Sequence, residues 1–287
     1  MSEHFLESCD PLDSRQFIIA VRKLADDLSY GTDRSPFLGS GIEYVQSRRY
    51  EIGDPIKSID WRITARTGKF HVKEYEAPIR MPVYLLVDTS ASMAISSSAL
   101  SKYAWALQIA GGIAFAALDR VSPVGVVGVG GRDLLVRPSL SRDRILQWLH
   151  QLRHYRLDEP TLLGARLAEL IPSLPSRALI IALSDLHDPE ALPTLKLAAQ
   201  KHDCVALQLI DPAEDGLRGA GFVRVREAES ATTTVARSRH QFTDPEAVAA
   251  DLKRAGIDHL QLRTDQPLAH TLRSFFRSRD VLGRGAR

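Results

Sequence analysis

The sequence contains few cysteines, no long apolar segment and no excess of charge of either sign. The two cysteines, Cys9 and Cys204, lie far apart in the chain. Cys204 begins an apolar run, where a reduced thiol behaves as a small hydrophobic side chain. Such thiols fit a reducing environment, so the sequence predicts a cytoplasmic location.

The other absences limit the partners. No segment approaches the ~18 uninterrupted apolar residues of a membrane span, and the amino terminus, MSEHFLESCD, lacks the basic-then-apolar order of a secretory signal. We therefore expect no membrane span. The 37 basic and 35 acidic residues nearly balance, so no global field favours nucleic acid, and nucleic acid is not the expected partner. The class of partner must therefore be inferred from individual binding sites and not from overall composition.

The chain has 287 residues, 44% of them hydrophobic, which is enough to bury a full-sized core. From about residue 83 to 210, short runs rich in Val, Ile and Leu alternate with helical patterns. This alternation predicts an α/β fold with a mostly parallel, doubly wound sheet between two helical layers. The expected strands are 83–87, 124–129, 178–183 and 204–210. Leu163, Leu167 and Leu170 recur at helical spacing and predict a core-facing stripe.

Other segments predict further elements. GVVGVGGRDLLVRP (125–138) reads as two strands joined by a Gly-Gly turn, which places an antiparallel strand at the sheet edge. Towards the carboxyl terminus we expect strands at 222–227 and 259–263, with helices near 245–255 and 267–278, in the same domain.

Residues 1–82 differ from the rest. A helix carries Phe17, Val21, Leu24 and Leu28 on one face. It is followed by IDWRIT (59–64), where apolar and polar residues alternate as in a strand. The sequence thus predicts a small, partly β subdomain over residues 1–82, appended to a main domain over residues 83–287. Trp61 and Ile59 are expected to pack this subdomain onto the main domain, while Asp54, Asp60 and Arg66 pair locally; a binding role of this region is the alternative.

Oxygen-bearing side chains follow two of the predicted strands. Asp88 directly follows VYLLV, and Asp185 follows ALIIALS. If these strands are neighbours, both carboxylates share one crevice with Ser90 and Ser92, and the loop before residue 162 adds Thr161. Hydroxyls and carboxylates suit Mg²⁺, with Mn²⁺ or Ca²⁺ as substitutes in vitro. Taken singly, the serines and Thr161 would also fit helix caps and turns.

These five residues carry a resemblance to a von Willebrand factor A-type domain. In that family, D-x-S-x-S after the first strand, a threonine on a later loop and an aspartate after the fourth strand form a metal-ion-dependent adhesion site. Asp88, Ser90, Ser92, Thr161 and Asp185 match it. The resemblance implies that the hydroxyls hold Mg²⁺, that the aspartates act largely through water, and that a sixth position accepts an Asp or Glu of a partner protein.

Residues 31–93 resemble a bacterial family known only as domain of unknown function fifty-eight, whose pattern is R-x-Y-x-x-G-D-x-x-x-x-I-D-W ahead of A-R and V-K. The matching residues are Arg48, Tyr50, Gly53, Asp54, Ile59, Asp60, Trp61, Ala65, Arg66, Val72 and Lys73. That family is often encoded beside MoxR-type AAA+ ATPases, so the resemblance implies a partner of this class.

The leading hypothesis is a non-enzymatic, Mg²⁺-dependent protein-interaction module. No phosphate-binding G-x-x-x-x-G-K-[ST] and no G-x-S-x-G nucleophile motif is present. Two alternatives stay open. Asp88 with Mg²⁺ would suit metal-assisted phosphate ester hydrolysis. Residues 48–73 hold seven Arg or Lys against three acids, which would suit nucleic-acid binding.

Overall fold

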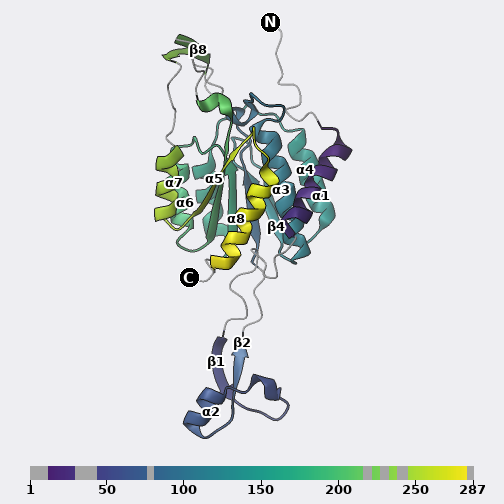
Figure 1. Ribbon diagram of the computed structural model, residues 1–287, viewed down its shortest axis with the longest axis vertical. Coiled ribbons are helices and arrows are strands. Elements are labelled where there is room, and N and C mark those ends of the chain that lie inside the picture. The colour runs from purple at the N-terminus through teal and green to yellow at the C-terminus, as the bar shows by residue number, and fades with distance from the viewer. Residues whose placement is uncertain are drawn as a thin grey trace.

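A computed structural model describes residues 12–29, 44–75, 81–215, 222–226, 233–237 and 245–282. Its main part is a six-stranded sheet in the order β10-β7-β6-β3-β4-β5 (Figure 1). The strands are β3 (Val83–Val87), β4 (Val124–Gly128), β5 (Leu135–Ser139), β6 (Leu179–Ser184), β7 (Asp203–Ile210) and β10 (Asp258–Arg263). Only β5 runs antiparallel to its neighbour. The predicted mostly parallel sheet with an antiparallel edge strand is confirmed.

Helices cover both faces of this sheet, as predicted (Figure 1). One layer consists of α1 (Ser14–Ser29), α3 (Lys102–Asp119), α4 (Arg142–Arg153) and α8 (Leu268–Leu282). The other consists of α5 (Leu163–Leu170), α6 (Ala191–Ala198) and α7 (Pro245–Arg254), and a short 3₁₀ turn, η3 (Ile171–Ser173), follows α5. Each layer shares its own apolar cluster with the strands. The protein therefore has a three-layer α/β architecture.

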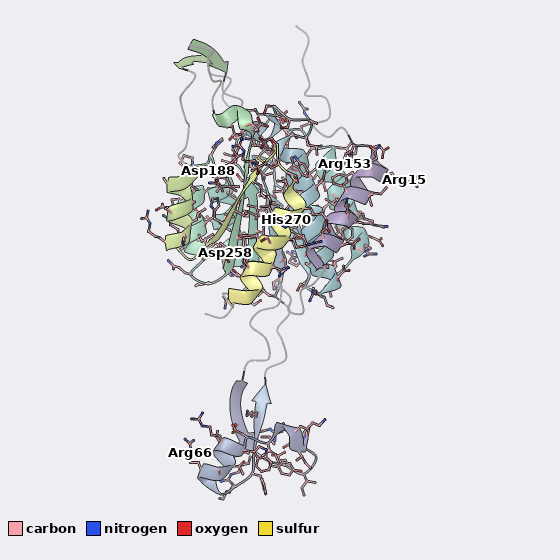
Figure 2. The ribbon with its side chains drawn as sticks, viewed as in Figure 1. Arg15, Arg66, Arg153, Asp188, Asp258 and His270 are labelled. Atoms are coloured by element: carbon pink, nitrogen blue, oxygen red, sulfur yellow. The ribbon has the colours of Figure 1, made fainter. Side chains whose placement is uncertain are left out.

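A separate small unit lies between α1 and β3 in the chain. It contains β1 (Tyr44–Arg49) paired antiparallel with β2 (His71–Tyr75), a 3₁₀ turn η1 (Ile56–Ser58) and helix α2 (Trp61–Thr67). Figure 2 places Arg66 on this helix. The predicted strand at IDWRIT is wrong, because the Asp60 side chain accepts hydrogen bonds from the backbone N–H groups of Arg62 and Ile63 and so caps a helix. Trp61 is exposed, so the described residues do not support its predicted packing role.

Helix α1, which the sequence grouped with residues 1–82, packs against α3 of the sheet domain. The contact is close because α3 carries two glycines. A Cβ atom at Gly111 would lie 2.8 Å from Val21, and one at Gly112 would lie 2.8 Å from Leu24. The apolar stripe of α1 is thereby buried, and this helix is part of the core of the main domain.

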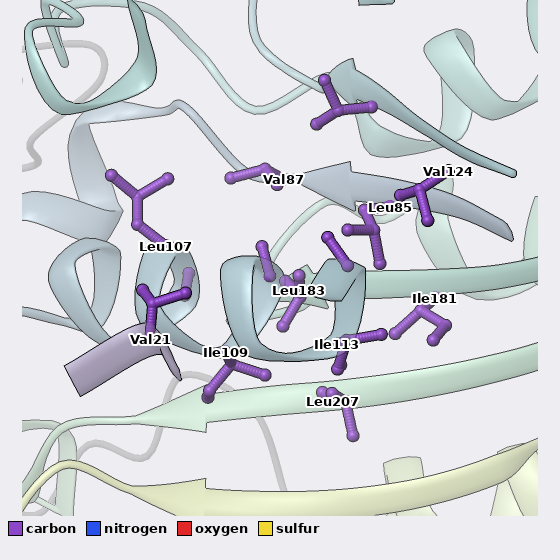
Figure 3. Close-up of a cluster of buried hydrophobic side chains, with 14 of the residues drawn as sticks. Val21, Leu85, Val87, Leu107, Ile109, Ile113, Val124, Ile181, Leu183 and Leu207 are labelled. Atoms are coloured by element: carbon purple, nitrogen blue, oxygen red, sulfur yellow. The ribbon is translucent and has the colours of Figure 1, made fainter. Parts of the chain in front are cut away.

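The core explains why the strands read as unbroken apolar runs. All five residues of β3 and all six of β6 are buried, since helices cover both faces. Figure 3 shows Leu85, Ile181 and Leu207 from three adjacent strands facing Ile109 and Ile113 of α3. Burying each such side chain contributes about 1.5–3 kcal/mol. This packing provides a rigid frame for the loops at the strand ends.

The carboxyl-terminal strands separate into two groups. β10 extends the main sheet beside β7. The predicted strand at 222–227 is β8 (Phe222–Arg226), which pairs with β9 (Thr233–Arg237) in a sheet of its own. The predicted helices near 245–255 and 267–278 are α7 and α8.

Cys204 lies on β7 and is 3% exposed. Burial raises the pKa of its thiol to about 12, so almost no thiolate forms at neutral pH. In a Cys9→Ser variant, we expect the native protein to react with a thiol reagent such as DTNB only on the timescale of unfolding, and within seconds in concentrated urea. Rapid native labelling would contradict this burial.

Candidate functional site

Four of the five residues singled out in the sequence follow the carboxyl ends of two paired strands, and the fifth, Thr161, lies on a neighbouring loop. Asp88 follows β3 and Asp185 follows β6, and these strands are parallel neighbours with Val87 opposite Leu183. Ser90 and Ser92 follow Asp88, with Ser92 in the short 3₁₀ helix η2 (Ala91–Ala94). Thr161 lies in the loop before α5. The sheet register therefore brings all of them to one edge.

Hydrogen bonds join these residues into one group, here called the oxygen cluster (Asp88, Ser90, Ser92, Thr161 and Asp185). Asp88 accepts from the Ser90 backbone N–H at 3.0 Å and from the Thr161 hydroxyl at 3.2 Å. The Ser90 and Ser92 hydroxyls are 3.1 Å apart, and Ser92 donates to Asp185 at 2.8 Å. Both aspartates and both serines are buried. The cluster thus joins three hydroxyls and two carboxylates by hydrogen bonds.

Sequence reasoning missed Lys102, at the start of α3. Its ammonium is 2.8 Å from Asp185 Oδ2 and also contacts Glu214 of η4 (Pro212–Asp215). Only 1% of the Lys102 side chain is exposed. A lysine in the first turn of a helix is unfavourable in the field of the helix dipole, and this was the one sign in the sequence that Lys102 has a specific partner.

His187 also contacts the site. Its Nδ1 lies 3.3 Å from Asp185 Oδ2, and its Nε2 lies 3.9 Å from Glu214 Oε2. Burial lowers the pKa of His187, but the neighbouring carboxylate of Asp185 outweighs this effect and raises it overall. Asp185 therefore has two basic neighbours.

The two aspartates of the oxygen cluster differ in their electrostatic environment. Burial and the nearby charge of Asp185 raise the pKa of Asp88, whose other partners are neutral donors. Burial also disfavours the charged form of Asp185, but His187 and Lys102 outweigh it and hold the pKa of Asp185 below its usual range. Within the described residues, Asp88 has no basic partner. Its negative charge is the uncompensated one.

Two further acids, which the sequence did not single out, fix the loops around the cluster. Glu159 accepts from the Thr89 hydroxyl at 2.6 Å and from the Arg132 backbone N–H at 2.8 Å. Asp188 accepts from the Gly164 backbone N–H at 2.8 Å. These contacts tie the loop that carries Thr161 to the loops after β3 and β6. Neither acid belongs to a motif visible in the sequence, since its partners are distant in the chain.

Asp211 directly follows β7 in the same way that Asp88 directly follows β3. It accepts hydrogen bonds from the Ser97 hydroxyl at 2.5 Å and from the Thr264 hydroxyl at 3.0 Å, and it is fully buried. Across the described ranges, no group of three or more His, Cys, Asp or Glu side chains is suited to a metal.

The chain is similar to uncharacterized proteins of two mycobacteria. One is from Mycobacterium bovis, and two are from strains of Mycobacterium tuberculosis. Each is 25% identical over 250 residues, which cover 85% of this chain and 77% of the relative.

Among solved structures, the chain is similar to an uncharacterized membrane spanning protein from Vibrio fischeri. The match has 18% identity, a TM-score of 0.21, and covers 69% of this chain and 96% of that one. A TM-score this low supports no inference about the fold. The description of that protein nevertheless contradicts the predicted cytoplasmic location, which is withdrawn. The prediction rested on thiol content and on the lack of long apolar runs, and neither of these determines the location of a protein in the cell. No helix in the described part of the chain is long and apolar enough to cross a bilayer.

The family description "Protein of unknown function DUF58" matches residues 46–254, well over half of the chain. The matched range contains the small unit except the first two residues of β1, the strands followed by Asp88 and Asp185, and the loop of Thr161. The protein therefore belongs to the DUF58 family.

Proposed function

We propose that this protein is a non-enzymatic, Mg²⁺-dependent protein-interaction module with a von Willebrand factor A-like site. The oxygen cluster would hold one Mg²⁺, or Mn²⁺ or Ca²⁺ in vitro, and an Asp or Glu of a partner protein would complete the coordination. The observation that carries the proposal is the convergence of three hydroxyls and two carboxylates at one edge of the sheet. Such oxygen donors match the preference of Mg²⁺.

The burial of Asp88 supports a cation at this place. An ionised carboxylate without a basic partner is unfavourable in a desolvated position. A divalent ion beside Asp88 would supply the missing positive charge. When bound, the metal would act as an electrostatic acceptor for the carboxylate of a partner.

Lys102 is compatible with this proposal, because its contact is with the other aspartate. Asp88, Asp185 and Glu214 together carry three negative charges, and the Lys102 ammonium carries one positive charge. At a pH above the raised pKa of His187, where its imidazole is neutral, these three negative charges and one positive charge leave a net charge of minus two. A single divalent cation would balance that charge, so the ammonium and the metal have complementary roles.

The class of partner is proposed from the family resemblance. Residues 31–93 match the pattern of a family often encoded beside MoxR-type AAA+ ATPases, and an ATPase of this class that presents an acidic residue is the proposed ligand. Recognition of one carboxylate by a metal leaves specificity to the surrounding surface.

The test measures metal binding directly by calorimetric titration with MgCl₂ or MnCl₂. Asp88→Asn keeps the shape of the side chain and removes one charge. At ~4 Å and an effective dielectric constant of about 20, one charge is worth about 4 kcal/mol, so we expect a loss of affinity of at least about a hundredfold. Retention of a MoxR-type ATPase on the immobilised chain should then require Mg²⁺ and fail in EDTA.

Asp211→Asn is the matched control, because Asp211 is also a buried aspartate at a strand end but lies outside the oxygen cluster. We expect its metal affinity to equal that of the wild type. Equal metal affinity of Asp88→Asn and wild type, or no binding of either ion to the wild type at millimolar concentration, would refute the proposal.

A further inference from the structure

The small unit formed by residues 44–75 exposes apolar side chains. Phe70 packs edge-to-face between Tyr50 and Trp61, with each pair of ring centroids 6.5 Å apart. Yet Trp61 is 63% and Phe70 57% exposed. Two isoleucines of the same unit, Ile52 and Ile56, are 102% and 72% exposed. Several exposed large apolar side chains on one small folded unit, with two of them in ring contact, indicate a site of interaction.

Polar residues of the unit hold this surface in shape. Arg48 makes a bidentate ion pair with Asp54, at 2.8 and 2.7 Å, and Asp54 also accepts from the Glu51 backbone N–H at 2.9 Å. These contacts close the loop that presents Ile52. Gly53 in that loop has a φ of +115°, a conformation that favours glycine.

Asp60 fixes the position of Trp61. Its side chain accepts from the Ser47 hydroxyl at 2.8 Å as well as from the first N–H groups of α2, and its own N–H donates to the His71 carbonyl at 2.7 Å. The start of α2 is therefore attached to both β1 and β2. The polar motif residues Arg48, Asp54 and Asp60 are engaged internally, whereas the motif residue Trp61 faces solvent.

The unit also has an excess of positive charge. Residues 48–73 contain seven Lys or Arg and three acids, and two of those acids, Asp54 and Asp60, are engaged in the contacts above. Within residues 44–75, the structure gives no ion pair to the exposed side chains of Arg62, Arg66 or Lys69. These cations lie on α2 and next to Phe70, and Arg66 projects from α2 in Figure 2.

We propose that this docking surface (Ile52, Ile56, Trp61, Arg62, Arg66, Lys69 and Phe70) binds an acidic protein segment that carries aromatic or aliphatic side chains. Tryptophan and arginine dominate binding energy at protein interfaces, and the surrounding cations steer acidic partners. Ile52 and Ile56 favour a protein over a nucleic acid, because aliphatic side chains offer no face on which bases stack. None of these residues belongs to the oxygen cluster, so binding here is independent of Mg²⁺.

The experiment selects from a phage-displayed library of random peptides on the full-length chain, in EDTA. We expect enrichment of Asp and Glu together with Trp, Phe or Leu. The selected peptides should bind Trp61→Ala and Phe70→Ala at least about tenfold more weakly than wild type. They should bind Ile19→Ala, which removes an exposed isoleucine of α1, with unchanged affinity. Peptides without acidic residues, or equal binding to Trp61→Ala, would overturn the proposal.

Charge reversal tests the electrostatic part. Arg66→Glu should weaken the selected peptides severalfold, whereas Lys253→Glu on α7 should not. All variants should keep the wild-type unfolding midpoint, because the replaced side chains are exposed. If Arg66→Glu and Lys253→Glu changed the peptide affinity equally, the proposal that positive charge on this surface selects an acidic partner would be contradicted.

Three further measurements test whether something other than an acidic protein segment covers the docking surface. Tight binding of a duplex or single-stranded oligonucleotide with a steep salt dependence, lost in Trp61→Ala, would overturn the proposal in favour of nucleic acid. A dimer seen by sedimentation in the wild type but not in Trp61→Ala would assign the surface to a second copy of this chain.

The Trp61 fluorescence is obtained by subtracting the spectrum of Trp61→Phe from that of the wild type, and we expect acrylamide to quench it. Protection from acrylamide in the monomer would show that the chain covers this surface itself.

Discussion

Lys102→Met lowers the free energy of unfolding by about 3–5 kcal/mol in the absence of Mg²⁺. The ammonium of Lys102 is buried between Asp185 and Glu214, with a distance of 2.8 Å to Asp185. Methionine has a similar shape but no charge, so two carboxylates remain near each other with reduced compensation. Urea unfolding followed by circular dichroism in EDTA measures the loss.

Lys196→Met is the matched control, because Lys196 also lies 2.8 Å from a carboxylate, that of Asp251. The Lys196 side chain is 39% exposed, so solvent screens the pair and we expect a change below about 1 kcal/mol. Equal losses for the two variants would contradict the conclusion that burial makes the Lys102 contact important.

Mg²⁺ should stabilise Lys102→Met more than it stabilises the wild type. Removing one positive charge changes the net charge of the site from minus two to minus three, and a ligand that binds only the folded state stabilises it more as its affinity rises. The same unfolding experiment with MgCl₂ in place of EDTA measures this difference. Equal stabilisation of both proteins would contradict the proposed cooperation between the ammonium and the metal.

The second large effect is expected at Gly164, where Ala destabilises the protein by about 1–3 kcal/mol or more. Alanine is the better helix former by about 1 kcal/mol, so propensity alone predicts the opposite sign. A Cβ atom at Gly164 would lie 2.6 Å from the backbone carbonyl carbon and oxygen of Glu190. Backbone atoms cannot rotate away as the end of a side chain can, so α5 and α6 would have to separate.

Gly131→Ala is the control, because the nearest atoms to its added Cβ lie 3.7 Å away, at ordinary contact distance. We expect a change of about 0.5 kcal/mol or less. Separation of α5 from α6 should also weaken metal binding, since the Gly164 N–H links the Thr161 loop to Asp188. A Gly164→Ala protein with wild-type stability would contradict the close packing described here.

The sheet was predictable because its signals are local. Strands buried on both faces read as continuous apolar runs, and β3, β4, β6 and β7 were placed to within one residue at each end. A polar residue directly after such a run must lie at the carboxyl end of the strand. This reasoning identified Asp88 and Asp185, and the parallel pairing of β3 with β6 then placed them together.

Short elements were less predictable. The alternation in IDWRIT fits a strand, but a segment of this length also fits two helical turns, and the cap provided by Asp60 selects the helix. The position of α1 was also not apparent from the sequence, because an apolar helix face does not specify the helix against which it packs. The two glycines of α3 that admit it, Gly111 and Gly112, lie far from it in the chain.

The sequence by itself determined the α/β class, the mostly parallel sheet and the four oxygen-bearing residues at two strand ends, with Thr161 on the loop before α5, since each depends on neighbours in the chain. Only the tertiary structure decided that Lys102 and Glu214 join Asp185, that Asp88 lacks a basic partner, and that Trp61 faces solvent. These features arise where segments distant in sequence meet. Burial and the resulting loss of solvent screening then set the strength of each charge interaction.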